Sequence, residues 1–469
     1  MGNVIVAGSI SVLLSVVSTA HGQAGFETSS DGHLRVSITG MGDAETTDTG
    51  TRGIGVPFSG VPDAVVELRR QIGGLQIADF DGDGHNDLVA VCYISNSFPP
   101  YDDWHDMIFY GTGSGLSTSP GWISDVETHT GDVQVGDLNN DGWMDIVTIH
   151  GGVRRDSVRV YFGSESGVET SPGYTSNTNQ SSWGTSGALF DVENDGDLDL
   201  VTTNQGISPD PFRPMLMFRN DNAMLTSAAV WQSAEDSIQG AVDAGDVNGD
   251  GFVDLGVSKW VNFESGIYLN LGGALSTTPA ATVGSTDTDK GAAFADIDGD
   301  GMLELGIGGD PSTVYDYSGG LLTPIYQSNP PFSGPQDFRF YDVDLDGDPD
   351  LAEINFSDGK AHIYLNRDGQ LDVQPTWTFD APEVGTALAF GDLNGDGRPD
   401  LALGYSGDTS IRIFYAIAPP CPADLNDDGV LNFFDVSIFI NTQFDFNGDG
   451  SFNFFDVSPF VAAMGAGCP

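Results

Sequence analysis

Asp79-Phe80-Asp81-Gly82-Asp83-Gly84-His85-Asn86-Asp87 is the segment on which the interpretation of this sequence depends. It places oxygen-bearing side chains at positions 1, 3, 5 and 9 of a nine-residue loop, and glycine at position 6. The same pattern begins six more times, at spacings of 58, 54, 55, 50, 46 and 50 residues, at Asp137, Asp191, Asp246, Asp296, Asp342 and Asp392. A period of about fifty residues is typical of a fold built from stacked repeats.

The loops have the ligand chemistry of calcium sites. Ca²⁺ takes about six to eight oxygen ligands, which alternate carboxylates on a tightly curled backbone supply, with glycine at the sixth position for the sharp turn. Position 7 offers only its backbone carbonyl, and its side chain varies from copy to copy. The alternative, that the loops are Asp-Gly turns between strands, does not require four oxygens in register. The predicted calcium ligands are Asp79, Asp81, Asp83, Asp87, Asp137, Asn139, Asp141, Asp145, Asp191, Glu193, Asp195, Asp199, Asp246, Asn248, Asp250, Asp254, Asp296, Asp298, Asp300, Glu304, Asp342, Asp344, Asp346, Asp350, Asp392, Asn394, Asp396 and Asp400.

Short apolar segments around every loop predict β-strands. Leu75–Ala78 precedes the first loop, Leu88–Val91 follows it, and a third segment with an aromatic residue near its end recurs, as at Met107–Tyr110. Four short strands in each repeat predict a mainly β fold, a seven-bladed β-propeller over residues 63–418. We expect Val65–Leu68 to supply the last blade with its fourth strand, which closes the ring and removes two open sheet edges.

The charge balance excludes one class of partner. The chain has 68 acidic and 16 basic residues, a net charge of −52. A chain so charged repels itself on compaction unless cations neutralise it. Nucleic-acid binding depends on clustered Lys and Arg, so we expect no nucleic-acid partner. Because 39% of the residues are hydrophobic and 10% are aromatic, the composition favours a folded core over disorder.

Residues 1–24 are predicted to be a signal peptide. Val4–Val17 is apolar or small and too short to span a bilayer, and small-x-Ala cleavage sites follow it. No Lys or Arg precedes it, and the alternative is a buried N-terminal strand. Residues 25–62 are expected to be irregular, as a decorated loop or an extra hairpin. The mature protein is therefore expected to be secreted or associated with the cell surface, without a transmembrane segment.

The loop and the strand after it resemble the FG-GAP repeat of integrin alpha chains and the related bacterial VCBS-type repeats. The resemblance covers about residues 60–418, and every unit carries the loop. It implies a calcium-binding seven-bladed propeller. Relatives include adhesion heads, lectin-like binders and some polysaccharide lyases, so the resemblance leaves the function open. Nothing in this chain corresponds to the inserted adhesion domain of integrins.

Residues 421–469 carry two longer loops of twelve residues, and the apolar spacing after each becomes helical. This tandem arrangement resembles a type I dockerin, which implies a small α-helical module with paired calcium loops and a cohesin-like partner. Loop positions 10 and 11 are paired phenylalanines, where cellulosomal dockerins often have small or polar residues that meet the cohesin. No known cohesin specificity follows, and the phenylalanines alternatively fill the core of the module. The predicted ligands are Asp424, Asn426, Asp428, Asn432, Asp435, Asp445, Asn447, Asp449, Asn453 and Asp456.

The three cysteines fit an exported chain. Cys421 and Cys468 bracket the C-terminal loops and are predicted to form a disulfide. Cys92 lies in a predicted strand, where we expect a buried thiol.

Catalytic residues are not identifiable from the sequence, because the histidines are scattered singly and metal loops explain the carboxylate pairs. Two classes of function remain. The first is a secreted calcium-binding propeller that is a binding or adhesion scaffold for an extracellular polymer or protein, with a dockerin-like module for assembly. The alternative is an extracellular polysaccharide-active enzyme, a lyase or glycoside hydrolase, carrying a dockerin. Propellers host both classes, so the fold does not decide between them.

Overall fold

The computed structural model describes residues 23–28, 34–39, 55–68, 70–93, 105–127, 129–150, 158–177, 182–206, 213–221, 223–260, 263–284, 290–329, 334–407 and 410–417, with Val436 and Phe439. The chain divides into two compact units, residues 1–51 and 52–469.

The first unit contains one antiparallel hairpin. Strand β1 (Gln23–Thr28) pairs with β2 (Leu34–Thr39), with Gln23 opposite Thr39 and Thr28 opposite Leu34. An extra hairpin was one of the two alternatives for this segment, and the structure has it. The first two residues of β1 belong to the segment predicted to be a signal peptide, and residues 1–22 lie outside the described part of the chain.

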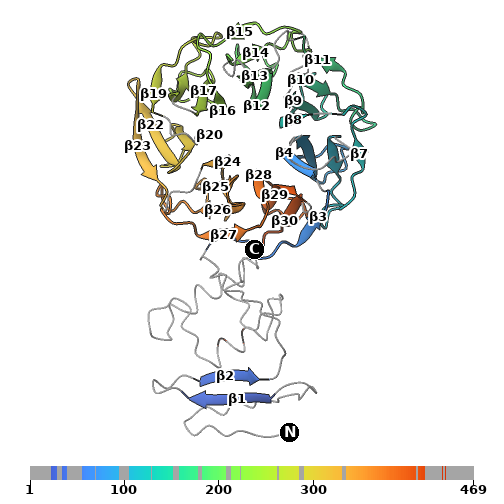
Figure 1. Ribbon diagram of the computed structural model, residues 1–469, viewed down its shortest axis with the longest axis vertical. Helices are drawn as coiled ribbons and strands as arrows, with labels where there is room; N and C mark the ends of the chain where they lie inside the picture. The colour runs from blue at the N-terminus through green and yellow to red at the C-terminus, as the bar shows by residue number, and fades with distance from the viewer. Residues whose placement is uncertain are drawn as a thin grey trace. The chain divides into compact units, whose positions relative to one another are not determined.

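In the second unit, the described residues from 55 to 417 form a ring of antiparallel sheets (Figure 1). Residues of all seven innermost strands line one pocket at the centre of this ring, which we call the channel. Five of the sheets are four-stranded, and neighbouring strands in each sheet follow one another in sequence. Their strands are β8 (Thr130–Gly136), β9 (Asp145–His150), β10 (Val158–Tyr161) and β11 (Tyr174–Thr175); β12 (Ser182–Phe190), β13 (Asp199–Gly206), β14 (Leu216–Phe218) and β15 (Trp231–Gln232); β16 (Gln239–Gly245), β17 (Asp254–Lys259), β18 (Ser265–Tyr268) and β19 (Ala281–Val283); β20 (Gly291–Ala295), β21 (Glu304–Gly308), β22 (Thr313–Ser318) and β23 (Leu321–Gln327); and β24 (Pro335–Tyr341), β25 (Asp350–Asn355), β26 (Lys360–Tyr364) and β27 (Trp377–Asp380).

The remaining strands of the ring form one eight-stranded sheet. They are β3 (Ala64–Val66), β4 (Arg70–Ala78), β5 (Asp87–Tyr93), β6 (Met107–Phe109), β7 (Trp122–Ile123), β28 (Val384–Gly391), β29 (Asp400–Gly407) and β30 (Ile411–Phe414). The prediction of seven separate blades is therefore wrong: the ring has five four-stranded blades and this larger sheet. The physical reason is a junction between β29 and β4, where Ser406 pairs with Gln71 and Gly407 with Arg70. Backbone groups at these strand ends find partners in each other, which joins two sheets into one.

The predicted closure of the ring is confirmed. Strand β3 pairs antiparallel with β30, with Ala64 opposite Ile413 and Val66 opposite Ile411. The N-terminal segment thus completes the sheet that contains the last strands of the ring, and it covers the edge of β30.

A second correction concerns the predicted C-terminal α-helical module. The elements of the described residues are all strands, so the fold is mainly β and no helical module is found among them. In the predicted module only Val436 and Phe439 are described; their backbone is helical, but they form no helical element.

The core lies between neighbouring sheets. The second strand of each sheet follows a loop and is buried along its length, as in β9, β17 and β25. Neighbouring sheets cover both faces of such a strand, which explains why its sequence is a continuous apolar run rather than an alternating one. One core cluster, for example, joins Val89 of β5, Val133 of β8 and Ile146 of β9. The sheets hold the channel and the loops in fixed positions.

Candidate metal centres

The seven nine-residue loops lie at one end of the ring. Each loop joins an inner strand to the second strand of the same sheet; the first, for example, runs from the end of β4 at Ala78 to the start of β5 at Asp87. The inner strands β4, β8, β12, β16, β20, β24 and β28 face the channel and repeat the same connection (Figure 1). We call this end of the ring the loop end.

The glycine at position 6 has one structural role in all seven loops. Its N–H donates to the carboxylate of position 1 at 2.7–3.0 Å. Its φ lies between 82° and 99°, the left-handed region that L side chains rarely adopt. The glycine therefore both turns the chain and holds the first predicted ligand.

Position 4 has the same backbone requirement, which the sequence interpretation missed. Its φ lies between 58° and 78° in every loop, and the residue is usually Gly or Asn. The sixth loop has Leu345 instead, at φ 61°. Leucine in this conformation is strained, because its Cβ approaches the following carbonyl oxygen.

The acid at position 9 is a structural residue as well as a predicted ligand. Its carboxylate accepts the backbone N–H of position 2 in all seven loops, at 2.7–3.3 Å. In six loops its other oxygen accepts a second backbone N–H, from a residue beyond the third strand, at 2.6–2.8 Å. These side chains are at most 2% exposed. The carboxylate therefore fixes the curl of the loop and its distance from the rest of the sheet.

Burial makes these carboxylates unusually basic. It raises the pKa of Asp87, Asp145, Asp254 and Asp400 to about 6, and that of Glu304 and Asp350 to about 7. The backbone N–H groups oppose this rise, while the other loop carboxylates add to it. The pKa of Asp199 is raised by burial too. A cation beside each loop would offset this electrostatic cost.

Three loops bring three carboxylates together, with one oxygen of each within 4.8 Å of the others. The first and sixth loops do so with positions 1, 3 and 9, and the fifth with positions 1, 3 and 5. The residues are Asp79, Asp81 and Asp87; Asp296, Asp298 and Asp300; and Asp342, Asp344 and Asp350. All the predicted ligands of the seven loops are among the described residues, and their role as calcium ligands stays a prediction.

Some carboxylate oxygens in the loops are buried without a hydrogen-bond partner. They are Asp296 Oδ1, Asp344 Oδ1 and Glu193 Oε2. Buried carboxylate oxygens normally have a partner, and an unmet one indicates a place for an ion or water. The donor set is oxygen alone, which suits a hard cation such as Ca²⁺. In the third loop Arg219 Nε lies 3.4 Å from the other oxygen of Glu193 and partly neutralises it.

Asparagines connect neighbouring loops, and the sequence interpretation missed them. Asn220, Asn270 and Asn366 follow the aromatic residue of the third strand by two positions, and each donates its side-chain N–H to the position-2 carbonyl of the preceding loop, at 2.7–2.8 Å. Asn86 donates to Asp392 O at 3.0 Å and thus connects the first loop with the last. The recurring aromatic-x-Asn spacing was the available signal.

Position 7 is less free than its variable side chain suggested. The Trp143 ring of the second loop packs over Gly82 of the first, where there is no room for a Cβ. Met302 of the fifth loop approaches Gly249 of the fourth in the same way. The first and second loops, and the fourth and fifth, are thus in direct contact.

Other predicted site residues fall partly outside the described chain. The twelve-residue loops between Asp424 and Asp456, and the cysteines Cys421 and Cys468, are not among the described residues. Cys92 is buried, as predicted.

Comparisons with known proteins support the repeat and the fold. Residues 79–148 and 342–403 match the FG-GAP-like repeat. The fold is similar to a crystal structure of BBS1N in complex with ARL6DN, soaked with lead, with a TM-score of 0.50 and 14% identity over 76% of this chain and 94% of that chain. At this identity the similarity shows the fold alone. Comparison with curated proteins gave no match. The chain therefore contains FG-GAP-like repeats in a β-propeller-like arrangement.

Proposed function

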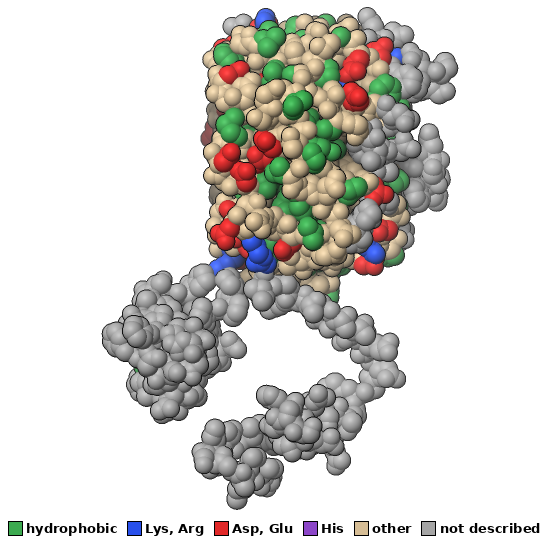
Figure 2. Space-filling model, turned by 90° about the vertical axis from the view of Figure 1, so that its left-hand side faces the viewer, with side chains coloured by type: hydrophobic (Ala, Val, Ile, Leu, Met, Phe, Trp, Pro, Cys, Tyr) green, Lys and Arg blue, Asp and Glu red, His purple; other side chains and the backbone are tan. Residues whose placement is uncertain are grey.

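We propose that this protein is a calcium-stabilised β-propeller that is a binding scaffold for an extracellular polymer or protein. The FG-GAP-like repeats and the propeller-like ring are consistent with a binding role. The observation that carries the calcium proposal is the recurring loop, with convergent carboxylates and buried, unpartnered carboxylate oxygens. Groups of acidic side chains are also visible on the side of the ring, where basic ones are few (Figure 2).

Calcium would stabilise the ring through the loop carboxylates. Positions 1, 3, 5 and 9 supply the oxygen ligands, and the backbone N–H bonds hold positions 1 and 9 in place before any ion binds. An ion that binds only the folded chain raises the free energy of unfolding. It also reduces the repulsion within a chain of net charge −52.

Thermal unfolding with and without a calcium chelator tests the calcium proposal. We expect the melting temperature to fall by tens of degrees on chelation and to recover when calcium is restored. Magnesium at the same concentration is the control, because its demand for a small octahedral site suits these loops poorly. An unchanged melting temperature after chelation would contradict the proposal.

We also infer that the protein is exported and that residues 421–469 attach it to a cohesin-like partner. The apolar Val4–Val17 stretch with its cleavage sites, and the paired twelve-residue loops, support these steps. No helix in the described part of the chain is long and apolar enough to span a membrane. Calcium stoichiometry tests the C-terminal loops: the full chain should bind nine ions, one in each loop, and the Asp424→Ala, Asp445→Ala variant seven. Native mass spectrometry counts them, and equal stoichiometry in the two chains would contradict calcium binding there.

A further inference from the structure

The channel contains a pocket of about 750 Å³. Its wall includes the first residues of the inner strands, for example Gln71 of β4 and Gln239 of β16, and the residues that follow the second strands, such as Trp260 and Phe356. Both sets lie at the end of the strands away from the loops, because the loops join the other ends. We call this end of the pocket the mouth. The pocket has the volume of an ordinary small-molecule site.

Lys290 at the mouth is an exceptional residue in this chain. The sequence contains only three lysines, Lys259, Lys290 and Lys360. Lys259 pairs with Glu235, and Lys360 Nζ lies 3.9 Å from both Asp358 and Asp380. Among the described residues no carboxylate lies within salt-bridge distance of Lys290. In a chain with 68 acidic residues, an unpaired and largely enclosed ammonium group is a candidate binding group for an anion.

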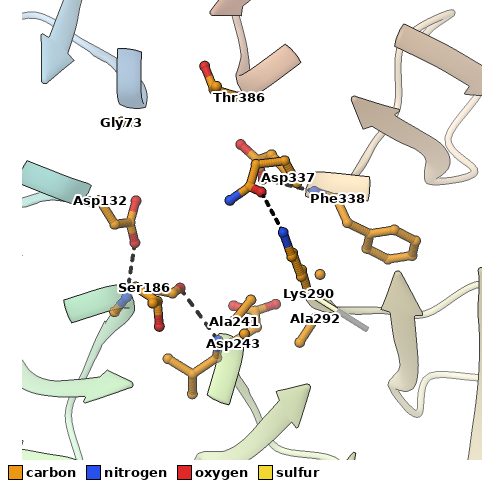
Figure 3. Close-up of a pocket in the computed structure, with 18 of the residues that line it drawn as sticks. Gly73, Asp132, Ser186, Ala241, Asp243, Lys290, Ala292, Asp337, Phe338 and Thr386 are labelled. Atoms are coloured by element: carbon orange, nitrogen blue, oxygen red, sulfur yellow. Dashed lines mark hydrogen bonds between the residues drawn. The ribbon is translucent and has the colours of Figure 1, made fainter. Parts of the chain in front are cut away.

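Two aromatic rings and an amide hold this ammonium group at the mouth. Lys290 Nζ lies 5.0 Å from the centroids of Trp260 and of Phe356, and it donates to Gln336 Oε1 at 3.2 Å. Lys290 extends into the pocket in Figure 3. Cation–π contacts orient a lysine without neutralising its charge. Phe356 is 44% exposed although it is a large apolar side chain, so part of it remains available to a ligand.

Amide groups continue the polar lining of the mouth. Gln71 and Gln205 line the pocket, and their side chains make no hydrogen bond to another described residue. Gln336 uses its carbonyl oxygen for Lys290 and keeps its NH₂ group. Amides that both donate and accept, beside an aromatic face, match the hydroxyl groups and C–H faces of a sugar ring.

The other charges of the pocket are committed to the fold. Asp132, Asp243 and Asp337 each accept a backbone N–H from the next inner strand, at 2.8–3.0 Å. Arg339 Nε pairs with Asp337 Oδ1 at 3.2 Å. These groups join neighbouring sheets, so among the described lining residues Lys290 is the cation without a carboxylate within salt-bridge distance.

The backbone next to Lys290, at the start of β20, differs from the backbone at the start of the other inner strands. A register shift occurs near the start of the inner strands β4, β8, β12, β16, β24 and β28. Strand β20 pairs with β21 without a shift, and Lys290 immediately precedes it. Bulges redirect side chains, so the regular start of β20 gives Lys290 a direction that the corresponding residues do not share.

We propose that the mouth of the channel binds a carboxylate-bearing sugar unit, with Lys290 as the partner of the carboxylate, the exposed part of Phe356 against the sugar ring, and the glutamine amides as partners of its hydroxyl groups. This inference rests on the proposed binding function and names the class of ligand. In this complex the sugar carboxylate pairs with Lys290, and the carboxylates of the loop end remain available to metal ions.

Titration of the full chain in calcium with uronic-acid trisaccharides tests the inference. The panel contains galacturonate, mannuronate, guluronate and glucuronate trimers, together with their methyl esters, in which a methyl group replaces the charge of each carboxylate. We expect one or more acids to bind and the matching ester to bind at least tenfold more weakly. Lys290→Met should weaken binding of that acid at least tenfold, whereas the matched control Lys360→Met should change it less than twofold.

Lysine acylation of the unmodified chain gives a second measurement that no substitution can disturb. A bound trimer should protect Lys290 and leave Lys360 reactive, which mass spectrometry reads directly because lysines are so few. Absence of binding across the panel, equal binding of acid and ester, or unchanged binding to Lys290→Met would overturn the inference. Melting of the same samples with and without chelator separates the calcium proposal from the sugar-binding proposal. Calcium-dependent stability without uronate binding would contradict only the sugar-binding proposal.

Discussion

The two ends of the ring are built on opposite principles. At the loop end the same contact recurs in every loop, such as the bond from the position-6 N–H to the position-1 carboxylate. At the mouth the residues around the starts of the inner strands differ from one strand to the next, among them Gln71, Gln239 and Lys290. Repetition indicates a requirement that every unit shares, which is the folding of its own loop. A residue that occurs once cannot serve such a requirement, so it indicates a specific ligand or a local contact.

Charge separates the two ends in the same way. The loop end gathers carboxylates whose mutual repulsion calls for cations, whereas the mouth holds an ammonium group that has no carboxylate partner among the described residues. A binding scaffold gains from this separation, because metal ions that stabilise the ring do not compete with a ligand at the other end.

The largest effect is expected at the loop end, when the structural carboxylate at position 9 is removed. Asp350→Ala removes the acceptor of two backbone N–H groups, those of Val343 and Asn366, at 2.9 and 2.7 Å. Buried donors left unsatisfied cost about 1–3 kcal/mol each, so we expect a loss of about 4 kcal/mol. Denaturant unfolding should show this loss in chelator, and a larger one in calcium, where a predicted ligand is removed as well.

Asp344→Ala is the matched control in the same loop. Asp344 Oδ1 has no hydrogen-bond partner, and burial and repulsion from Asp346 and Asp342 outweigh the one hydrogen bond that this carboxylate accepts, from the Asp346 backbone N–H. The loss of the side chain should therefore reduce stability mainly when calcium is present. Without calcium the substitution should be neutral or slightly stabilising, because it removes repulsion from neighbouring carboxylates. If Asp350→Ala costs stability only in calcium, position 9 is a ligand without the structural role assigned to it.

Positions 3 and 9 show which features of the loops the sequence predicts and which it does not. The nine-residue pattern predicted where every loop lies, and the orphan strand near Val65 predicted how the ring closes. It did not separate positions 1 and 9, which hold the loop together, from position 3, where one carboxylate oxygen of the sixth loop has no hydrogen-bond partner. That difference depends on which backbone N–H groups lie nearby, and these come from residues far along the chain.

Contacts between units could not be predicted from the sequence for the same reason. The eight-stranded sheet results from two residue pairs at the ends of β29 and β4, and no pattern within either repeat specifies them. The bridging asparagines were readable in principle, because Asn220, Asn270 and Asn366 share one spacing from an aromatic residue. The residues of the mouth could not be predicted from the sequence, because they are far apart in the chain and unlike one another.

A smaller effect, spread over many groups, is the pH dependence of the calcium-free chain. Burial raises the pKa of the position-9 acids to about 6 or 7, so the folded chain binds more protons than the unfolded chain between about pH 4 and 7. The free energy of unfolding must then fall as the pH rises through this window. The buried His362, whose pKa is lowered to about 4, acts in the opposite direction, but it is a single group.

Denaturant midpoints at pH 4.5 and 7.5, with chelator and with saturating calcium, check the sign. In chelator the midpoint should be higher at pH 4.5. In calcium the order should reverse, because protons displace the ion from the loop carboxylates at low pH. A calcium-free midpoint that rises with pH would show that the acids of the loop end do not dominate the titration.

The smallest expected effect tests one requirement that all seven loops share, the left-handed backbone conformation at position 4. Leu345 departs from the Gly or Asn of the other loops at position 4, with a φ of 61°. The left-handed conformation costs an L residue about 1–2 kcal/mol, and glycine gives back part of this gain through its greater freedom in the unfolded chain. Leu345 is 57% exposed, so its removal loses little apolar burial. We therefore expect Leu345→Gly to raise the free energy of unfolding by about 1 kcal/mol, measured by denaturant unfolding in calcium. Leu345→Ala keeps the Cβ and should give no such gain; equal gains from both would mean that the exposed leucine side chain, and not the backbone conformation, is the unfavourable feature.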